Sequence, residues 1–350
     1  MSTFRVEVTR IDEVLPHPNA DRLELVRIRG WKAVAARGVH AAGDAVVYIP
    51  EDAVLPEPVL AAMELTGKLA GKEHNRVKAI RLRGELSQGL LMPMHVLHAL
   101  DGAREHAPGT DVAEALGITK WEEPIPVHLV GVAIPWPSWM HRYTDIENIK
   151  NFPGVLRGGE PVVFTEKLHG ACAAFGMAAG GDGEMFVASR SLCLARDEAN
   201  AYWRVALEME VAQHLRALLA ATRAASATLY GELLGVQDLK YGFVNGRVGL
   251  RWFDVALEGA YQDYDGDAHR LLLARGLERV PVLYQGPFSE AVLAEHTDGT
   301  TVMGAGHVRE GVVVRPAAER YDVDANLGRV ILKSISGDYL TRKGQATEFH

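Results

Sequence analysis

At the centre of the chain stands Val162-Val163-Phe164-Thr165-Glu166-Lys167-Leu168-His169-Gly170. The apolar first half predicts a buried strand, and this strand delivers a lysine, Lys167, to its end. A glycine three places on, Gly170, lets the backbone come close to whatever the lysine attacks. A lysine amine can form a phosphoramidate with a nucleotide phosphorus if it is deprotonated and aligned with the leaving pyrophosphate. Lys167 is therefore the candidate nucleophile.

The nucleophile alone is a weak signal. Lys-x-x-Gly arises by chance in a 350-residue chain with 35 glycines. The unperturbed lysine pKa of about 10.4 must also be lowered by a metal ion, burial or nearby cations before the amine can act. Five further segments add weight, because each places a polar residue next to an apolar run. In chain order they are residues 188–191, 229–233, 251–255, 310–314 and 330–334.

This ordered series resembles the six signature motifs of the covalent nucleotidyltransferases, which are the ATP-dependent DNA ligases, the RNA ligases and the messenger-RNA capping enzymes. His169 stands where DNA ligases and capping enzymes usually carry aspartate, and Lys-x-His-Gly is the RNA ligase form. Residues 142–148 also resemble the short helix that precedes the first motif in RNA ligases. The resemblance spans about residues 140–343. It implies an α+β nucleotidyltransferase domain with antiparallel sheets and flanking helices.

The resemblance implies a part in ATP binding for the polar and aromatic motif residues. Arg190 would contact the nucleotide sugar and the terminal phosphate, and Glu232 would bind a ribose hydroxyl. Phe253 would stack on the purine, although strand alternation leaves open whether Phe253 or Trp252 faces the pocket. The structural alternatives are a surface arginine at Arg190 and ordinary core packing at Phe253.

Two charged residues are expected at the phosphates. Glu310 ends a buried strand, where only a cation or metal-bound water makes its charge tolerable, and the resemblance implies that it holds the waters of a catalytic Mg²⁺ or Mn²⁺. Lys333 would grip the α-phosphate. His169 and Gly170 complete the nucleotide site within the first motif. Glu166 would line the base pocket, although alternation points its side chain away from that of the lysine.

One departure concerns the last motif. The family often carries two lysines separated by one residue, whereas this chain reads Lys333-Ser334-Ile335. The second cation is therefore absent or supplied from elsewhere. Arg342, Lys343 and Lys240 are the candidates.

The N-terminal third, residues 1–118, contains short β-like runs at regular spacing, which suggests a small barrel or sandwich. Residues 17–24 resemble the loop that opens the OB modules of tRNA-binding proteins. We therefore expect a small all-β OB-like barrel that binds nucleic acid, with a plain structural β domain as the alternative. Basic residues at 27–32 and 76–83 offer either a track for phosphates or a solvated strand face.

Residues 119–139 are rich in proline and tryptophan, which predicts a semi-rigid connector whose tryptophans pack against one of the domains. The nucleotidyltransferase domain would then occupy residues 140–350. Within that domain, Asp197 could cap one long helix that runs to Ala224.

The composition sets wider limits. With 48% hydrophobic residues and a net charge of −8, the chain can bury a large core but is not suited to coat nucleic acid by bulk attraction. No apolar run approaches a membrane span and the first residues lack the form of a signal peptide, so we expect a cytoplasmic monomer with no membrane partner. Cys172 and Cys193 have no metal-site spacing and are interpreted as small apolar residues.

The order of the domains indicates which branch of the covalent nucleotidyltransferases this chain resembles most. DNA ligases and capping enzymes typically carry an OB domain after the last motif, whereas the barrel-like module comes first here, as in the fifth family of RNA ligases. That resemblance implies three steps: formation of lysyl-AMP, transfer of AMP to a 5′-phosphate, and sealing by a 3′-hydroxyl. The partners would be nicked duplex RNA or RNA/DNA hybrids in RNA repair. The alternatives are an ATP-dependent DNA ligase, a GTP-using capping-type enzyme and, in another class, a non-catalytic RNA-binding protein.

Overall fold

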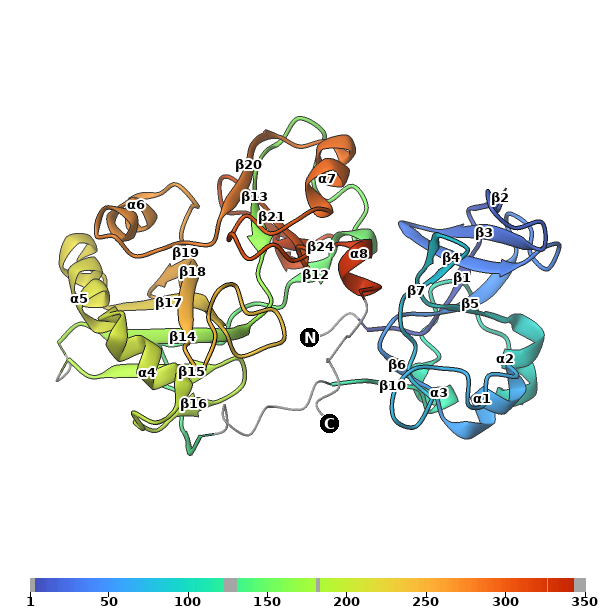
Figure 1. Cartoon of the computed structure of the whole chain (residues 1–350), viewed down its shortest axis with the longest axis horizontal. Coiled ribbons are helices and arrows are strands. Elements are labelled where there is room, and N and C mark those ends of the chain that lie inside the picture. The colour runs from blue at the N-terminus through green and yellow to red at the C-terminus, as the bar shows by residue number, and fades with distance from the viewer. Residues whose placement is uncertain (1–3, 103, 123–130, 181–182, 326, 343–350) are drawn as a thin grey trace. The chain divides into compact units, whose positions relative to one another are not determined.

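Figure 1 shows the computed structural model of the chain, which describes residues 4–102, 104–122, 131–180, 183–325 and 327–342. The chain divides into two compact units. The first comprises residues 1–123 with 340–350, and the second comprises residues 124–339. In the described ranges, no helix is both long enough and apolar enough to cross a membrane.

The first unit is built from short antiparallel strands. Two three-stranded sheets have the orders β1-β5-β9 and β2-β3-β4, and two further pairs are β6-β10 and β7-β8. The strands are β1 (Glu7–Arg10), β2 (Glu13–Pro16), β3 (Leu23–Ile28), β4 (Trp31–Ala36), β5 (Ala45–Ile49), β6 (Ala53–Val54), β7 (Ile80–Leu82), β8 (Glu85–Ser87), β9 (Leu90–Pro93) and β10 (Thr119–Lys120). The helices are α1 (Glu57–Ala62), α2 (Met94–Asp101) and α3 (Ala113–Leu116).

Strand β5 is apolar along its whole length because both of its faces are covered. Val47 and Ile49 pack into one buried cluster. Val46 and Tyr48 pack into a second cluster. Neighbouring side chains of a strand point to opposite faces, so a strand buried on both sides needs a continuous apolar run instead of alternation.

The loop that resembles those of tRNA-binding OB modules is tied to the β7-β8 turn. The ring of His17 lies with Nε2 3.0 Å from the Leu82 carbonyl, and its Nδ1 accepts a hydrogen bond of 3.1 Å from the Asn19 backbone. The Asn19 side chain in turn donates to the Arg83 carbonyl at 3.1 Å. The side chains of His17 and Asn19 therefore stabilise the position of the β7-β8 turn.

Several basic side chains of the first unit are paired with acidic ones. The pairs are Arg27 with Glu13, Arg29 with Glu7, Lys32 with Glu85 and Arg76 with Asp52. Pairing offsets much of the positive charge that these four residues would present to a phosphate backbone. The expected phosphate-binding track at residues 27–32 and 76–83 therefore carries less net positive charge than its number of basic residues indicates.

Tryptophans from the proline-rich segment pack against protein groups. The Arg76 guanidinium lies 3.3 Å from the centre of the Trp121 ring, within the first unit. Trp139 meets Phe186 edge to face at 5.8 Å, within the second unit. Pro124 and Pro126 lie outside the described residues.

The second unit combines two sheets with flanking helices. The large sheet has the order β11-β16-β15-β14-β17-β18-β19 and the small sheet the order β12-β24-β21-β13-β20. The large sheet consists of β11 (Ala133–Ile134), β14 (Ala171–Ala178), β15 (Met185–Ser189), β16 (Cys193–Leu194), β17 (Ser226–Leu234), β18 (Gly249–Leu257) and β19 (Ala260–Tyr261). The small sheet consists of β12 (Glu147–Asn148), β13 (Pro161–Lys167), β20 (Val282–Pro287), β21 (Gly311–Pro316) and β24 (Leu332–Ile335). A separate pair is β22 (Tyr321–Asp322) with β23 (Gly328–Arg329).

Neighbouring strands in both sheets of this unit are antiparallel, except that β12 runs parallel to β24. The helices are η2 (Ile149–Asn151), α4 (Ala201–Glu208), α5 (Val211–Thr222), α6 (Asp267–Ala274), α7 (Glu290–Thr297) and α8 (Gly337–Leu340). Figure 1 shows α4, α5 and α6 beside the large sheet and α7 beside the small one. The expected α+β class, with antiparallel sheets and flanking helices, is confirmed.

The expectation of one long helix from Asp197 to Ala224 is wrong. Two helices, α4 and α5, occupy this region, and Asn200 caps the first by accepting a hydrogen bond from the Tyr202 backbone at 3.0 Å. Glu210 interrupts them because its φ of 51° is left-handed and cannot continue an α-helix. Both helices nevertheless present an apolar face to the core, since Val205 and Leu215 are buried against the large sheet.

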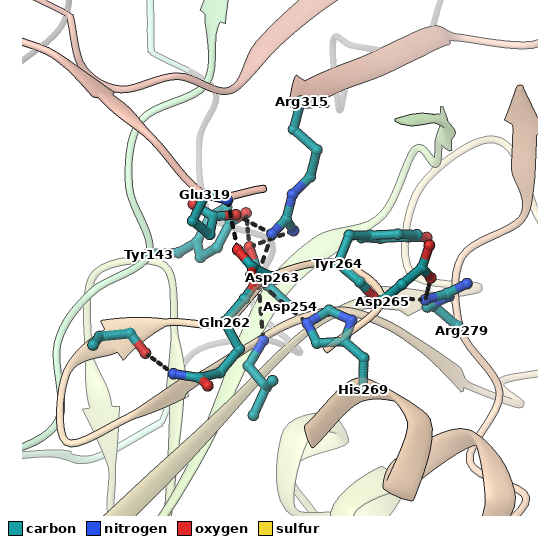
Figure 2. Close-up of polar contacts among 12 residues, drawn as sticks. Tyr143, Asp254, Gln262, Asp263, Tyr264, Asp265, His269, Arg279, Arg315 and Glu319 are labelled. Carbon is teal, nitrogen blue, oxygen red and sulfur yellow. Dashed lines mark hydrogen bonds and ion pairs between the residues drawn. The ribbon is translucent and has the colours of Figure 1, made fainter. Parts of the chain in front are cut away.

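A buried charge network joins the two sheets. Asp254 of β18 has no exposed surface, and its carboxylate lies 3.2 Å from Arg315 of β21 and 2.7 Å from Arg329 of β23. The Tyr143 hydroxyl donates to the same carboxylate at 2.8 Å, and Glu319 pairs with both arginines. Figure 2 shows Asp254 with Tyr143, Arg315 and Glu319 around it. Burial alone would raise the pKa of Asp254, but the two arginines hold it well below its ordinary range.

We expect Asp254→Asn to destabilise the protein by about 3–5 kcal/mol, because it leaves Arg315 and Arg329 buried with one anion fewer. A carboxyl whose native pKa is depressed stabilises the fold fully above its unfolded pKa of about 4, and this contribution is lost as the pH falls through the native pKa. The variant should therefore lose much of the acid dependence of its unfolding free energy. Urea denaturation at pH 7 and at successively lower pH measures both effects.

The control is Asp267→Asn, because the Asp267 side chain is 99% exposed and its pair with Arg270 lies on the surface. A change within about 0.5 kcal/mol is expected there. Equal unfolding free energies for Asp254→Asn and the parent would show that the network does not hold the sheets.

Candidate active site

The expected nucleophile meets the acidic residue of a later motif. Lys167 ends β13, and Glu310 comes directly before β21, which pairs antiparallel with β13 so that Lys167 lies opposite Gly311. The Lys167 amine lies 2.6 Å from Glu310 Oε1. Their side chains are 25% and 10% exposed. The strand pairing therefore brings together two residues that are far apart in the sequence.

Gly311 is required for this arrangement. A Cβ atom at this position would lie 2.1 Å from the Ser334 carbonyl oxygen of β24, closer than real atoms approach. The absence of a side chain lets β21 lie directly against the strand that carries Lys333, whose Cα partner is Val313. Glu310 and Lys333 thus come from neighbouring strands of the small sheet.

The charge state of the lysine is set by carboxylates. Burial disfavours the charged amine, yet Glu310 and Glu232 raise the pKa of Lys167 above its ordinary value. Burial likewise opposes the charge on Glu310, but Lys167 and His169 lower the pKa of that carboxyl to about 2. Lys167 is therefore an ammonium group at neutral pH in this structure. It must lose a proton before it can act as a nucleophile.

Glu232 reaches the site because of another glycine. A Cβ on Gly170 would lie 2.2 Å from the Leu233 carbonyl oxygen and 2.9 Å from Cγ of Glu232. Cys172, two residues on, is the strand partner of Glu232 in the pairing of β14 with β17. Burial raises the pKa of Glu232 to about 7, and it raises the pKa of the Cys172 thiol to about 12. Gly170 thus lets its backbone lie against β17 next to Glu232, whereas its expected approach to the substrate stays a prediction.

His169 is held by three side chains that the sequence did not identify. Its backbone N–H donates to the Tyr241 hydroxyl at 2.8 Å, its Nε2 lies 2.6 Å from Asp238, and its Nδ1 lies 3.0 Å from the Tyr339 hydroxyl. Burial lowers the pKa of the imidazole, but Asp238 and Glu310 outweigh this and raise it to about 9. Asp238 and Tyr241 flank Lys240, which the sequence offered only as a candidate second cation.

Of the three candidates for a second cation, Lys240 is the one whose contact the structure describes. Lys240 donates to the Gly235 carbonyl of its own loop at 3.1 Å, and Lys343 lies outside the described residues. His169, with its raised pKa, is the additional cation that the structure places next to Glu310, at 3.7 Å.

The large sheet supplies the remaining expected residues. Arg190 follows β15, forms an ion pair with Asp145, and has a side chain that is 62% exposed. Trp252 is fully buried in the helix-covered core, so Phe253 takes the other face of β18. Phe253 packs against Tyr143 at 4.9 Å. Trp252 is therefore a core residue, and of the two rings Phe253 is the candidate for stacking on a base.

Glu166 is almost completely buried, with 1% of its surface exposed. Its Oε2 accepts a hydrogen bond of 3.0 Å from the Val302 backbone, whereas its Oε1 has no hydrogen-bond partner. Leu168, two residues further along, packs in one apolar cluster with Tyr241 and Phe253. Glu166 therefore points away from Lys167, as alternation predicted, and toward the side on which Phe253 lies.

The donor set suits a hydrated divalent cation. Glu310 Oε2 is buried without a hydrogen-bond partner, and carboxylate oxygen is a preferred ligand of Mg²⁺ and Mn²⁺. Within the described part of the chain, no three His, Cys, Asp or Glu side chains group to hold a metal. Mg²⁺ usually keeps several waters and binds through one or two carboxylates and substrate phosphates, so one carboxylate at this place is a sufficient protein ligand.

Comparison with known proteins agrees with this geometry. The RNA ligase family model matches residues 160–335, half of the chain. The chain belongs to the RNA ligase family. An OB-fold domain model matches residues 5–94, so the expected N-terminal OB module is confirmed. No curated protein matches the chain.

Solved structures of the Naegleria gruberi RNA ligase are similar to the whole chain. A variant of that ligase with ATP and Mn is 25% identical, with a TM-score of 0.78, and the match covers 96% of this chain and 98% of that chain. The complex with PPi is 25% identical, with a TM-score of 0.77 and coverages of 97% and 98%. Another variant, with AMP and Mn, is 25% identical, with a TM-score of 0.76 and coverages of 96% and 98%.

If the protein takes up label from ATP, we expect Tyr339→Phe to slow this labelling about fivefold, because the imidazole of His169 loses one hydrogen bond of about 1 kcal/mol while the aromatic packing is kept. Single-turnover labelling of the protein by ATP measures the rate. Tyr284→Phe is the matched control, since it removes a 2.8 Å hydrogen bond to the Pro287 carbonyl on β20. If both variants label at the parental rate, Tyr339 has no part in positioning His169.

Proposed function

We propose that the protein is an ATP-dependent RNA ligase that seals 3′-hydroxyl/5′-phosphate nicks through a covalent lysyl-AMP. One observation carries the proposal: Lys167 and Glu310, from two separate motifs, meet at 2.6 Å with Glu232 close enough to raise the pKa of the lysine. A structural core has little use for a buried lysine among carboxylates, whereas a lysine nucleophile needs neighbours that control its charge.

In the first step, Nζ of Lys167 attacks the α-phosphorus of ATP, a P–N bond forms and pyrophosphate leaves. The amine must first give up the proton that Glu310 and Glu232 stabilise on it. A bound Mg²⁺ or Mn²⁺ would be held by Glu310 and would neutralise charge on the phosphates. The ion pair of Lys167 with Glu310 therefore has to open before attack.

In the second step the 5′-phosphate of the broken strand attacks the phosphorus of lysyl-AMP and takes over the AMP. In the third step the 3′-hydroxyl attacks that 5′-phosphate, the phosphodiester bond forms and AMP leaves. Lys333 of β24 and Arg190, which follows β15, would offset charge on the phosphates, since both side chains are positively charged. Glu232 would bind the ribose, Phe253 would stack on the base, and Glu166 would contact the edge of the base.

The substrate would be a nick in duplex RNA or an RNA/DNA hybrid, bound with help from the OB-fold domain. The fold supports this part of the proposal, because OB folds often bind nucleic acid. The domain limits of 1–118, 119–139 and 140–350, the monomeric state, the cytoplasmic location and a role in RNA repair belong to the same proposal.

We expect Lys167→Ala to abolish labelling of the protein by α-labelled ATP and sealing of ordinary nicks. The variant should still join a strand that already carries 5′-AMP, because the last step does not use the lysine as a nucleophile. The measurements are protein labelling and sealing of both kinds of nick in the presence of Mg²⁺.

Lys240→Ala is the matched control, since Lys240 bonds only to its own loop in the described contacts, and labelling at the parental level is expected. Sealing of ordinary nicks by Lys167→Ala at the parental rate would contradict the proposal. A parent protein that binds RNA but takes up no label would instead support the non-catalytic alternative. Label from GTP in place of ATP would support a capping-type enzyme, and a preference for DNA at the 3′-hydroxyl would support a DNA ligase.

A further inference from the structure

Two buried acceptor atoms without hydrogen-bond partners lie on the side of the site where Phe253 packs. One is Oε1 of Glu166 and the other is Nε2 of His307. A buried acceptor that is left unsatisfied costs about 1–3 kcal/mol. Two such atoms in one region indicate that a ligand supplies the missing donors.

The hydrogen bonds that Glu166 and His307 already make show which of their atoms can still accept a hydrogen bond from a ligand. Oε2 of Glu166 accepts a hydrogen bond of 3.0 Å from the Val302 backbone N–H, so Oε1 is the acceptor without a partner. Nδ1 of His307 lies 2.9 Å from the Val308 carbonyl oxygen. A carbonyl can only accept, so Nδ1 carries the proton and, in the neutral ring, Nε2 presents a lone pair.

Local contacts bring the two side chains to the same region. Residues 300–308 form a hairpin in which Thr300 pairs with Val308 and the Thr301 backbone donates to the His307 carbonyl at 3.0 Å. Thr301 and His307 therefore lie across from each other on this hairpin, and Val302, whose backbone binds Glu166, comes directly after Thr301. The His307 ring also meets Tyr241 edge to face at 4.7 Å.

Tyr241 links this hairpin to the surface on which the base would lie. Its ring belongs to the same apolar cluster as Leu168 and Phe253. A purine that stacks on Phe253 would thus have the hairpin with its two acceptors near one edge. A 6-amino group donates two hydrogen bonds, whereas a 6-oxo group would bring a third acceptor against the other two.

We propose that His307 is a specificity-determining residue that acts with Glu166 to select a 6-aminopurine over a 6-oxopurine nucleoside triphosphate. The inference rests on the proposed function, because it assumes that the base of the nucleotide lies against Phe253. Discrimination of this kind is strong in proteins, since the wrong base leaves buried polar groups unpaired.

The test compares ATP with inosine triphosphate, which carries a 6-oxo group, as donors to Lys167 under single-turnover conditions. The parent should prefer ATP. His307→Phe keeps an aromatic ring against Tyr241 but removes the acceptor, and it should lower the ATP preference about tenfold. His307→Gln, which restores an acceptor through its amide oxygen, should recover part of the preference. His296→Phe is the matched control, because His296 also bonds a backbone carbonyl through Nδ1 and packs on an aromatic ring, Phe164.

An unchanged preference in His307→Phe, with lysine labelling intact, would overturn the inference and leave the proposed function standing. Absence of label from either nucleotide in the parent would instead overturn the proposed function. If His307→Phe does not fold, the inference can be tested on the parent protein alone. Its labelling by purine riboside triphosphate, which has no 6-substituent, is then compared with its labelling by ATP and by inosine triphosphate. The inference requires this analogue to be used less well than ATP and better than inosine triphosphate. Equal use of the three nucleotides would refute it.

Discussion

The ion pair between Lys167 and Glu310 is the contact on which the site depends. It joins the end of β13 to the start of β21 and places a lysine and a carboxylate largely out of water at 2.6 Å. Removing one partner would leave the other as an uncompensated charge, so the two residues act as a unit. The pair also makes the resting lysine an ammonium group, so the proposed attack by Lys167 requires these two charges to separate first.

The two sheets contribute different parts of the site and have to stay in register. The small sheet supplies Lys167, Glu310 and Lys333, while the large sheet supplies Arg190, Glu232 and Phe253. The network around Asp254 provides the connection, because it bonds the strand of Phe253 to Arg315 of β21. Only well-paired ions can be kept in such a buried position, and here Asp254 and Glu319 face two arginines.

Sequence motifs singled out residues that the structure brings together, since Lys167 and Glu310 form an ion pair and Glu232 lies close enough to raise the pKa of the lysine. Glu310 is buried but paired with a cation, and Gly170 occupies a place where a side chain would collide with the Leu233 carbonyl oxygen. Sequence was a poor guide to helix continuity, since a single left-handed residue, Glu210, divides the expected helix while leaving its apolar period intact. It also gave no sign of Tyr339, which reaches His169 across a sequence separation of 170 residues.

The amino-acid sequence by itself determined the antiparallel α+β class, the presence of an N-terminal OB module and the set of residues with catalytic potential. The strand-rich class follows from local periodicity, whereas the OB module and the site residues follow from the resemblance of short segments to the motifs of known families. Only the tertiary structure decided that Trp252 rather than Phe253 is buried in the helix-covered core, that His169 is enclosed by Asp238, Tyr241 and Tyr339, and that one acceptor atom each of Glu166 and His307 has no hydrogen-bond partner. Such facts depend on strand register and on contacts between distant segments, which no local pattern records.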